Sequence, residues 1–305
     1  MHIAADKKDY ITLIVASYWL GIFQGFECEF EKAQKSFQVA LDINTAAKSL
    51  WGIATQKAQM AYYCYFFPGK INALMELSSD ALKIAQESGD PISRGVSHTV
   101  HGIACYTKGY LEKAENHTLQ GKDLLVRIGM HGWALAAILW VSQTYFEMKE
   151  YRKSKVCFEQ GLRIYETTGI VPSWARLLHL GIARSGLMLG ERDVNLESLR
   201  AIVGKNRVKA AEGWGCRYLG EILLNLGDSH NAETDQWIRK SIEADSRNGM
   251  MFSLGSDYAL YGEYFKRQGD RTRAQEELGK AAEIMRQCGA DGWVEKYQKE
   301  LAALS

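Results

Sequence analysis

The stretch YALYGEYFKRQGDRTRAQEELGKAAEIMRQCG, residues 258–289, decides the fold. Apolar or small residues recur in it at intervals of three and four, which is the periodicity of an amphipathic helix. The pattern breaks at Gly269 and again at Gly289, because glycine readily takes the left-handed conformation that ends a helix. The stretch therefore predicts two helices joined by a short turn, with Ala274 and Ala281 on the buried stripe of the second helix.

This two-helix pattern recurs along the chain at an interval of 40 residues. The glycines that keep the interval form two columns, Gly89, Gly129, Gly169, Gly249 and Gly289 in one and Gly69, Gly109 and Gly269 in the other. Eight positions before the first column the residues are all small, which lets helices approach closely: Ala81, Gly121, Gly161, Ser241 and Ala281. A fixed period of this length is typical of stacked repeats, each burying its apolar face against its neighbours. We predict an all-α solenoid of about seven helical hairpins over residues 1–290 and a C-terminal capping helix over residues 291–305.

Composition narrows the class of protein. Hydrophobic residues make up 47% of the 305 and charged residues 24%, a globular balance, and three prolines suit a chain that is mostly helix. Lysine plus arginine (37) nearly cancels aspartate plus glutamate (36), so we expect no direct nucleic-acid partner and no anionic membrane partner. No secretion signal or bilayer-spanning run is present, and the six cysteines form no CxxC pair. We therefore expect reduced thiols and a cytoplasmic protein.

Motifs for chemistry are missing from the sequence. It has no GxxxxGK[ST] phosphate loop, no GxSxG elbow and no HExxH pair. His98 and His101 lie three residues apart on one predicted helix, a spacing that could bind a metal with further ligands. They also occupy slots that face a partner helix, so we favour packed, hydrogen-bonded histidines. We expect no catalytic residue, no metal and no cofactor, and hence no enzyme.

The columns resemble the tetratricopeptide repeat, whose signature is an aromatic residue, Leu-Gly, an aromatic residue, then Ala, an aromatic residue and Ala. The last and first units carry it best, in Tyr258, Tyr261-Gly262, Phe265, Ala274, Leu278 and Ala281, and in Leu20-Gly21, Ala33, Phe37 and Ala40. The resemblance implies a right-handed superhelix with the first helices of the hairpins on its concave surface. The family's usual repeat has 34 residues, so an interval of 40 implies lengthened helices.

The lengthened form is similar to the C-terminal repeat regions of large bacterial signalling ATPases and of maltose-type transcription activators. Tryptophans stand four or five residues after the unit boundary, at Trp133, Trp174, Trp214 and Trp293. The resemblance implies that the chain is bacterial and is the repeat portion of a longer polypeptide, with an ATPase or cyclase module on its N-terminal side.

The concave surface is the predicted functional site. Its N-terminal half is aromatic and uncharged, which indicates a bound helix, peptide or ligand, although tighter superhelical closure or a missing domain would also cover it. The expected partner-binding residues are Tyr63, Tyr106, Gln143, Phe146, Trp214, Arg217 and Glu221. We predict a protein–protein interaction or regulatory scaffold that binds a peptide or helix in this groove. The alternative is a small-molecule sensor that relays ligand binding to an attached ATPase, cyclase or DNA-binding module.

Overall fold

Helices account for nearly all of the chain. The computed structural model describes residues 9–304; residues 1–8 and 305, part of the predicted solenoid and cap, lie outside the described range. Within that range there are α-helices, one π-helical segment, two 3-10 turns and no strand. The α-helices are α2 (Tyr10–Phe26), α3 (Phe30–Ala46), α4 (Leu50–Met60), α5 (Ile71–Ser88), α6 (Pro91–Thr107), α7 (Leu111–Arg127), α8 (His131–Glu147), α9 (Tyr151–Thr168), α10 (Pro172–Met188), α11 (Leu196–Gly204), α12 (Glu212–Leu226), α13 (Asn231–Arg247), α14 (Met251–Arg267), α15 (Arg271–Cys288) and α16 (Asp291–Leu304). The predicted all-α repeat fold is confirmed.

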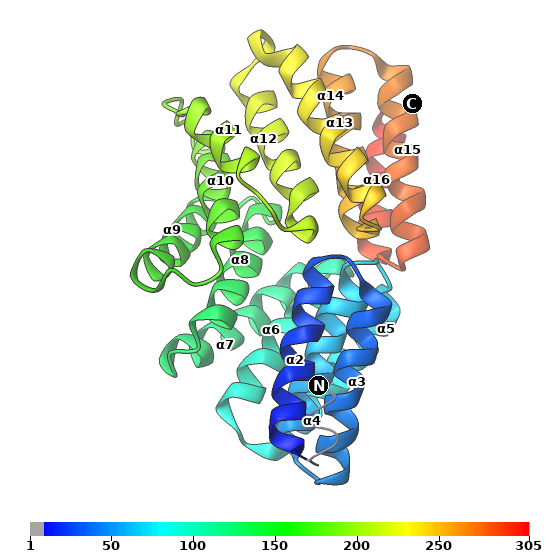
Figure 1. The fold of residues 1–305 in the computed structure, drawn as a ribbon. Coiled ribbons are helices and arrows are strands. Elements are labelled where there is room, and N and C mark those ends of the chain that lie inside the picture. Colours follow the sequence, from blue (N-terminus) through cyan, green and yellow to red (C-terminus); the bar gives the residue numbers. More distant parts are fainter. Residues whose placement is uncertain (1–8, 305) are drawn as a thin grey trace.

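Consecutive helices pair into seven hairpins, from α2/α3 to α14/α15, and α16 follows the last of them. In the second hairpin α4 continues into the π-helical segment η1 (Ala61–Phe66). The second helix of the fifth hairpin, α11, has only 9 residues, and the 3-10 turn η2 (Lys209–Ala211) leads from it into α12. Figure 1 shows the helices stacked side by side along the chain, with the N-terminal hairpins below the C-terminal ones in that view.

The glycine columns mark the turns between helices. Gly89, Gly169 and Gly289 end α5, α9 and α15 in the left-handed conformation, with φ of 70°, 64° and 78°. Residues with a side chain are strained in this backbone conformation, so the turns can be recognised in the sequence as glycines. In the other column, the position 40 residues after Gly109 is Lys149, which has a φ of 63° although it lacks the conformational freedom of glycine.

Small residues set the spacing between the helices. A Cβ on Gly121 of α7 would lie 2.9 Å from the carbonyl oxygen of Gly95 in α6, and a Cβ on Gly181 of α10 would lie 2.5 Å from the ring of Phe158 in α9. Both distances are below a normal contact, so a larger residue would push the helices apart. The predicted small-residue stripe is therefore a packing surface.

The stack winds far enough for its last hairpin to meet the third. The amide of Gly292, at the start of α16, donates to the carbonyl of Lys108, after α6, at 3.0 Å. The indole Nε1 of Trp293 donates to the carbonyl of Tyr106 at 2.8 Å. The Lys108 ammonium donates across the same junction to Gly289 O at 2.6 Å. These contacts join segments more than 180 residues apart and close the superhelix.

This closure covers much of the inner aromatic surface. The rings of Phe66 and Phe252 have centroids 6.3 Å apart, and those of Tyr106 and Trp293 lie 5.5 Å apart. Tyr62 meets Trp133 at 5.8 Å in the same interior. Of the two explanations for the aromatic face, tight superhelical closure accounts for its N-terminal half. Side chains of that half such as Tyr62 and Phe66 are already buried against the rest of the chain, and binding of a partner by this surface stays a prediction.

None of the helices in residues 9–304 is long and apolar enough to cross a membrane.

Candidate ligand-binding cavity

A cavity of about 260 Å³ remains on the inner side of the closed stack. Its walls come from η1, from the first helices α6, α8, α10, α12 and α14, and from α16. No second helix of any described hairpin contributes to it. The inner position of the first helices, which the family resemblance implied, is therefore found at the cavity.

Six of the seven predicted site residues line this cavity: Tyr106, Gln143, Phe146, Trp214, Arg217 and Glu221. Their role in binding stays a prediction. Tyr63 does not line it, and its side chain is only 4% exposed. The Tyr63 ring packs against Phe26 and Phe37, with centroids 5.3 Å and 5.9 Å away. Tyr63 is therefore a core residue, packed against the first hairpin of the stack.

Aromatic rings form the floor of the cavity. Trp140 and Trp214 lie 5.2 Å apart between centroids, and Phe252 and Trp293 lie 6.1 Å apart. Trp140 also meets Phe66 edge-on at 5.0 Å, so the floor continues directly into the core. Large rings locked by neighbours on both sides give a preformed apolar surface.

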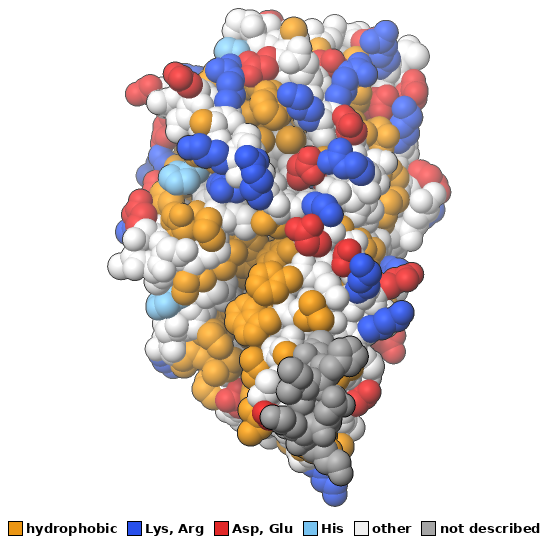
Figure 2. Space-filling view, viewed as in Figure 1, with side chains coloured by type: hydrophobic (Ala, Val, Ile, Leu, Met, Phe, Trp, Pro, Cys, Tyr) orange, Lys and Arg blue, Asp and Glu red, His pale blue; other side chains and the backbone are white. Residues whose placement is uncertain are grey.

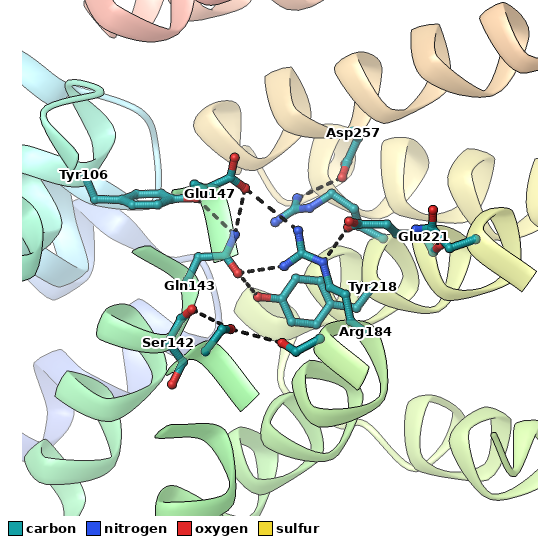
Figure 3. A network of polar contacts seen from close by, with 12 residues as sticks. Tyr106, Ser142, Gln143, Glu147, Arg184, Tyr218, Glu221 and Asp257 are labelled. Carbon is teal, nitrogen blue, oxygen red and sulfur yellow. Dashed lines mark hydrogen bonds and ion pairs between the residues drawn. The ribbon is translucent and has the colours of Figure 1, made fainter. Parts of the chain in front are cut away.

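A buried arginine organises the polar wall (Figure 3). Arg184 of α10 donates from Nη1 to Gln143 Oε1 at 2.9 Å and lies 2.7 Å from Glu221 Oε2. Its guanidinium stacks on Phe146, 3.4 Å from the ring centroid, and on Tyr218 at 4.5 Å. Burial would lower the pKa of Arg184, but Glu221 and its other neighbours outweigh that effect and raise it. The side chain is therefore a fixed cation with little freedom to turn.

Gln143 connects this arginine to the third hairpin. Its Nε2 donates to the Tyr106 hydroxyl at 3.1 Å and to Glu147 Oε1 at 3.2 Å, while its Oε1 also accepts from the Tyr218 hydroxyl. The pKa of Tyr106 is well above its ordinary value, first because of burial and then because of Glu147. One amide therefore links α6, α8, α10 and α12, which fixes the relative position of four first helices.

A second buried arginine faces the cavity from α12. Arg217 Nη1 donates to Asp257 Oδ1 at 2.9 Å and to Ser253 O at 3.2 Å, and Asp245 Oδ2 lies 3.8 Å away. Both carboxyl groups are fully buried, and burial raises the pKa of each. Asp257 adds to the rise for Asp245, because one guanidinium faces two carboxyl groups.

The mouth of the cavity is formed by α14 and α16 and is richer in acids than in bases. Lys296 Nζ bonds Glu147 Oε2 at 3.2 Å and lies over the Trp293 ring at 4.7 Å. Glu263 and Glu300 also line this end. Burial raises the pKa of Glu300, against the lowering effect of Lys296.

Sequence reasoning missed several lining residues, among them Arg184, Glu147 and Lys296. Arg184 could have been predicted from the sequence, since it is a lone charge inside the apolar run LLHLGIARSGLML of a first helix. Glu147 lies about one helical turn after Gln143, and Gln143 was among the predicted site residues. Lys296 gave no such signal, because its place in the cavity depends on where α16 docks.

His98 and His101 are packed side chains. His98 Nδ1 lies 3.1 Å from His117 Nδ1, and His101 Nδ1 lies 3.1 Å from Ser78 Oγ. Burial, with a contribution from His117, lowers the pKa of both to about 4. Within residues 9–304 no group of three His, Cys, Asp or Glu side chains is placed to hold a metal ion.

Comparison with known proteins agrees with this architecture. Residues 135–168, which cover α8 and α9, match the tetratricopeptide repeat family. This hairpin is a tetratricopeptide repeat. No curated protein matches this chain in sequence.

Solved structures with the same fold include the apo form of RapI, at 15% identity and a TM-score of 0.65 over 90% of this chain and 97% of that one. Aspartyl phosphate phosphatase F from Bacillus subtilis aligns at 15% identity and a TM-score of 0.63, over 94% of this chain and 75% of that one. The Rap conjugation gene regulator of the plasmid pLS20, in complex with the Phr* peptide, aligns at 11% identity and a TM-score of 0.54, over 94% and 98%. At these identities the likeness concerns the fold.

Proposed function

We propose that this tetratricopeptide-repeat protein binds a short peptide, one end of which enters the cavity between the first helices and α16. The observation that carries the proposal is the cavity itself, with an aromatic floor and hydrogen-bonding groups on one wall. A volume of about 260 Å³ suits one or two side chains, so the rest of a peptide would lie along the mouth. The Phr* peptide complex of a protein with the same fold supports this class of ligand.

The chemistry of the cavity favours a ligand with a cationic group. Arg184 and Arg217 are paired with carboxylates, and at the mouth Glu263 is paired with Arg267 at 2.9 Å, which leaves Glu300 as the acid there without an ion pair among the described residues. A cation over an aromatic face gains roughly 0.5–2 kcal/mol, more where water is excluded. We therefore expect peptides with a lysine or arginine to bind more tightly than those with glutamate at the same place.

The proposal makes the chain a binding and regulatory module without chemistry of its own. The arginines that face the cavity serve the fold, since each neutralises buried acids from neighbouring helices. The attached ATPase or cyclase module and the cytoplasmic location expected from the sequence remain part of this proposal. The small-molecule sensor remains its rival, because a cavity of this size also suits a compact ligand.

The test is selection from a random peptide library on the immobilised chain, followed by calorimetry with the selected peptides. Ala259→Trp would fill the cavity, since Ala259 lines it from α14. Ala201→Trp is the matched control, on the exposed surface of α11 and outside the cavity. We expect Ala259→Trp to weaken peptide binding at least tenfold and the control to leave it unchanged. Peptides that bind both variants equally, or a selection that yields no binder, would refute the proposal.

A further inference from the structure

The first helix of the stack presents a row of apolar side chains that are all more than half exposed. Ile11, Val15, Trp19 and Phe23 follow one another at four-residue intervals on α2, and they are 78%, 51%, 53% and 62% exposed. Figure 2 shows hydrophobic side chains gathered over this part of the molecule, with few charged groups among them. Isolated exposed apolar residues are ordinary, but a continuous row along one helix marks an interaction surface.

The position of α2 in the stack explains the row. The first helix of every later hairpin has the preceding hairpin beside it, as α6 has α4 and α5 and α8 has α6 and α7. In α2 the corresponding face has no such neighbour among the described residues. Its 17 residues, YITLIVASYWLGIFQGF, contain no charged side chain. The composition is therefore that of a helix packed on both sides.

We propose that this face is the interface of a symmetric dimer, in which the α2 helices of two copies pack against each other. The absence of charge means that two identical faces meet without repulsion, as a two-fold interface requires. The four side chains of the row offer roughly 500 Å² at about 200 Å² for each large side chain. Standard interfaces bury about 800 Å² on each partner, rim included, so the row is large enough for the centre of an interface with a second copy.

The geometry of the dimer follows from the spacing of the row. Ridges of residues four apart pack into one another with the helices crossing at about −50°. The midpoint of the row lies between Val15 and Trp19, so Val15 of one copy faces the same part of α2 in its partner. The interface leaves the peptide cavity free, because no residue of α2 lines that cavity.

Light scattering on the full chain across the micromolar range tests the dimer. We expect the mass of two chains for the wild type and for Val156→Asp, a control at an equally exposed valine (53%) on α9. Trp19→Asp should give the mass of one chain with an unchanged circular dichroism spectrum. A wild type that stays at the mass of one chain, or a Trp19→Asp variant that stays at two, would overturn the proposal.

Cross-linking gives a second test that does not depend on a destabilising charge. Val15→Cys should form a covalent dimer with a short bis-maleimide, whereas the wild type and Val156→Cys should not. Equal cross-linking of Val15→Cys and Val156→Cys would overturn the proposed geometry.

Discussion

Replacement of Lys108 by methionine tests whether closure of the superhelix contributes to stability. Lys108 is 8% exposed, and its ammonium donates to Asn72 Oδ1 at 2.8 Å, Gly289 O at 2.6 Å and Asp291 Oδ2 at 2.7 Å. Methionine keeps the apolar stem and removes all three bonds. The Asp291 side chain is 65% exposed, so that pair contributes under about 1 kcal/mol. The two neutral acceptors are left without their partner, at about 1–3 kcal/mol each.

The expected loss in the free energy of unfolding is therefore about 3 kcal/mol. With an unfolding entropy near 2.1 cal/mol/K per residue, about 300 residues correspond to a fall in Tm of roughly 5 °C. Two contacts of the junction survive, because Gly292 N and Trp293 Nε1 both bond to backbone carbonyls. We expect faster hydrogen exchange at the Gly292 amide, since its bond to the Lys108 carbonyl opens more often in the variant.

Lys209→Met is the matched control. Lys209 also joins distant segments, through Glu27 at 3.1 Å, but both side chains are about half exposed. An exposed pair contributes little, so the control should change the free energy of unfolding by less than about 0.5 kcal/mol. Urea unfolding of both variants measures the difference. If Lys108→Met lost no more than Lys209→Met, the reasoning that closure is held by a buried ammonium would be refuted.

Two further changes test the interior of the third hairpin. His98 and His101 have folded-state pKa values of about 4, below an unfolded value near 6.5. The stability that their neutral forms contribute is therefore complete above pH 6.5 and is lost as the pH falls toward 4, by roughly 3 kcal/mol for each. Urea titrations at a series of pH values should show this loss, and the His98→Gln/His101→Gln variant should show a flatter dependence of stability on pH. Gly121→Ala should cost about 1–3 kcal/mol because its Cβ meets α6, whereas Gly279→Ala, with open space around it in α15, should be neutral or stabilising by up to about 1 kcal/mol. Equal effects at the two glycines, measured by thermal unfolding, would contradict the role given to the small-residue stripe.

The hairpins could be predicted from the sequence because their turns require particular residues. Gly89, Gly169 and Gly289 have positive φ, and the local backbone geometry alone favours glycine at such positions. The same holds for Gly121, where a close helix contact excludes a side chain. Six of the lining residues of the cavity were also predictable, since the first helices of such repeats face inward and Gln143 and Arg217 stand out there as polar residues.

Closure of the superhelix was one alternative from the sequence, but the extent of closure could not be predicted. The degree of winding depends on a small rotation between successive hairpins, which adds up over seven of them and leaves no residue pattern. The contact between Lys108 and Gly289 spans 181 residues. One trace existed in the sequence: Gly109 and Gly292 meet backbone to backbone, and a Cβ on Gly109 would lie 2.8 Å from the Cα of Gly292. A single sequence gives no means of pairing the two glycines.

The position of the cavity follows from how aromatic and polar residues are distributed along the first helices. In α12 Trp214 comes near the start and Glu221 two turns later, and in α16 Trp293 precedes Glu300 by the same interval. Trp214 and Trp293 belong to the aromatic floor, and Glu221 and Glu300 line the same cavity two turns further along their helices. Helix C-termini carry partial negative charge, which adds to the glutamates at the same end. We therefore place the proposed cationic ligand at the glutamate end of α12 and α16, above the aromatic floor.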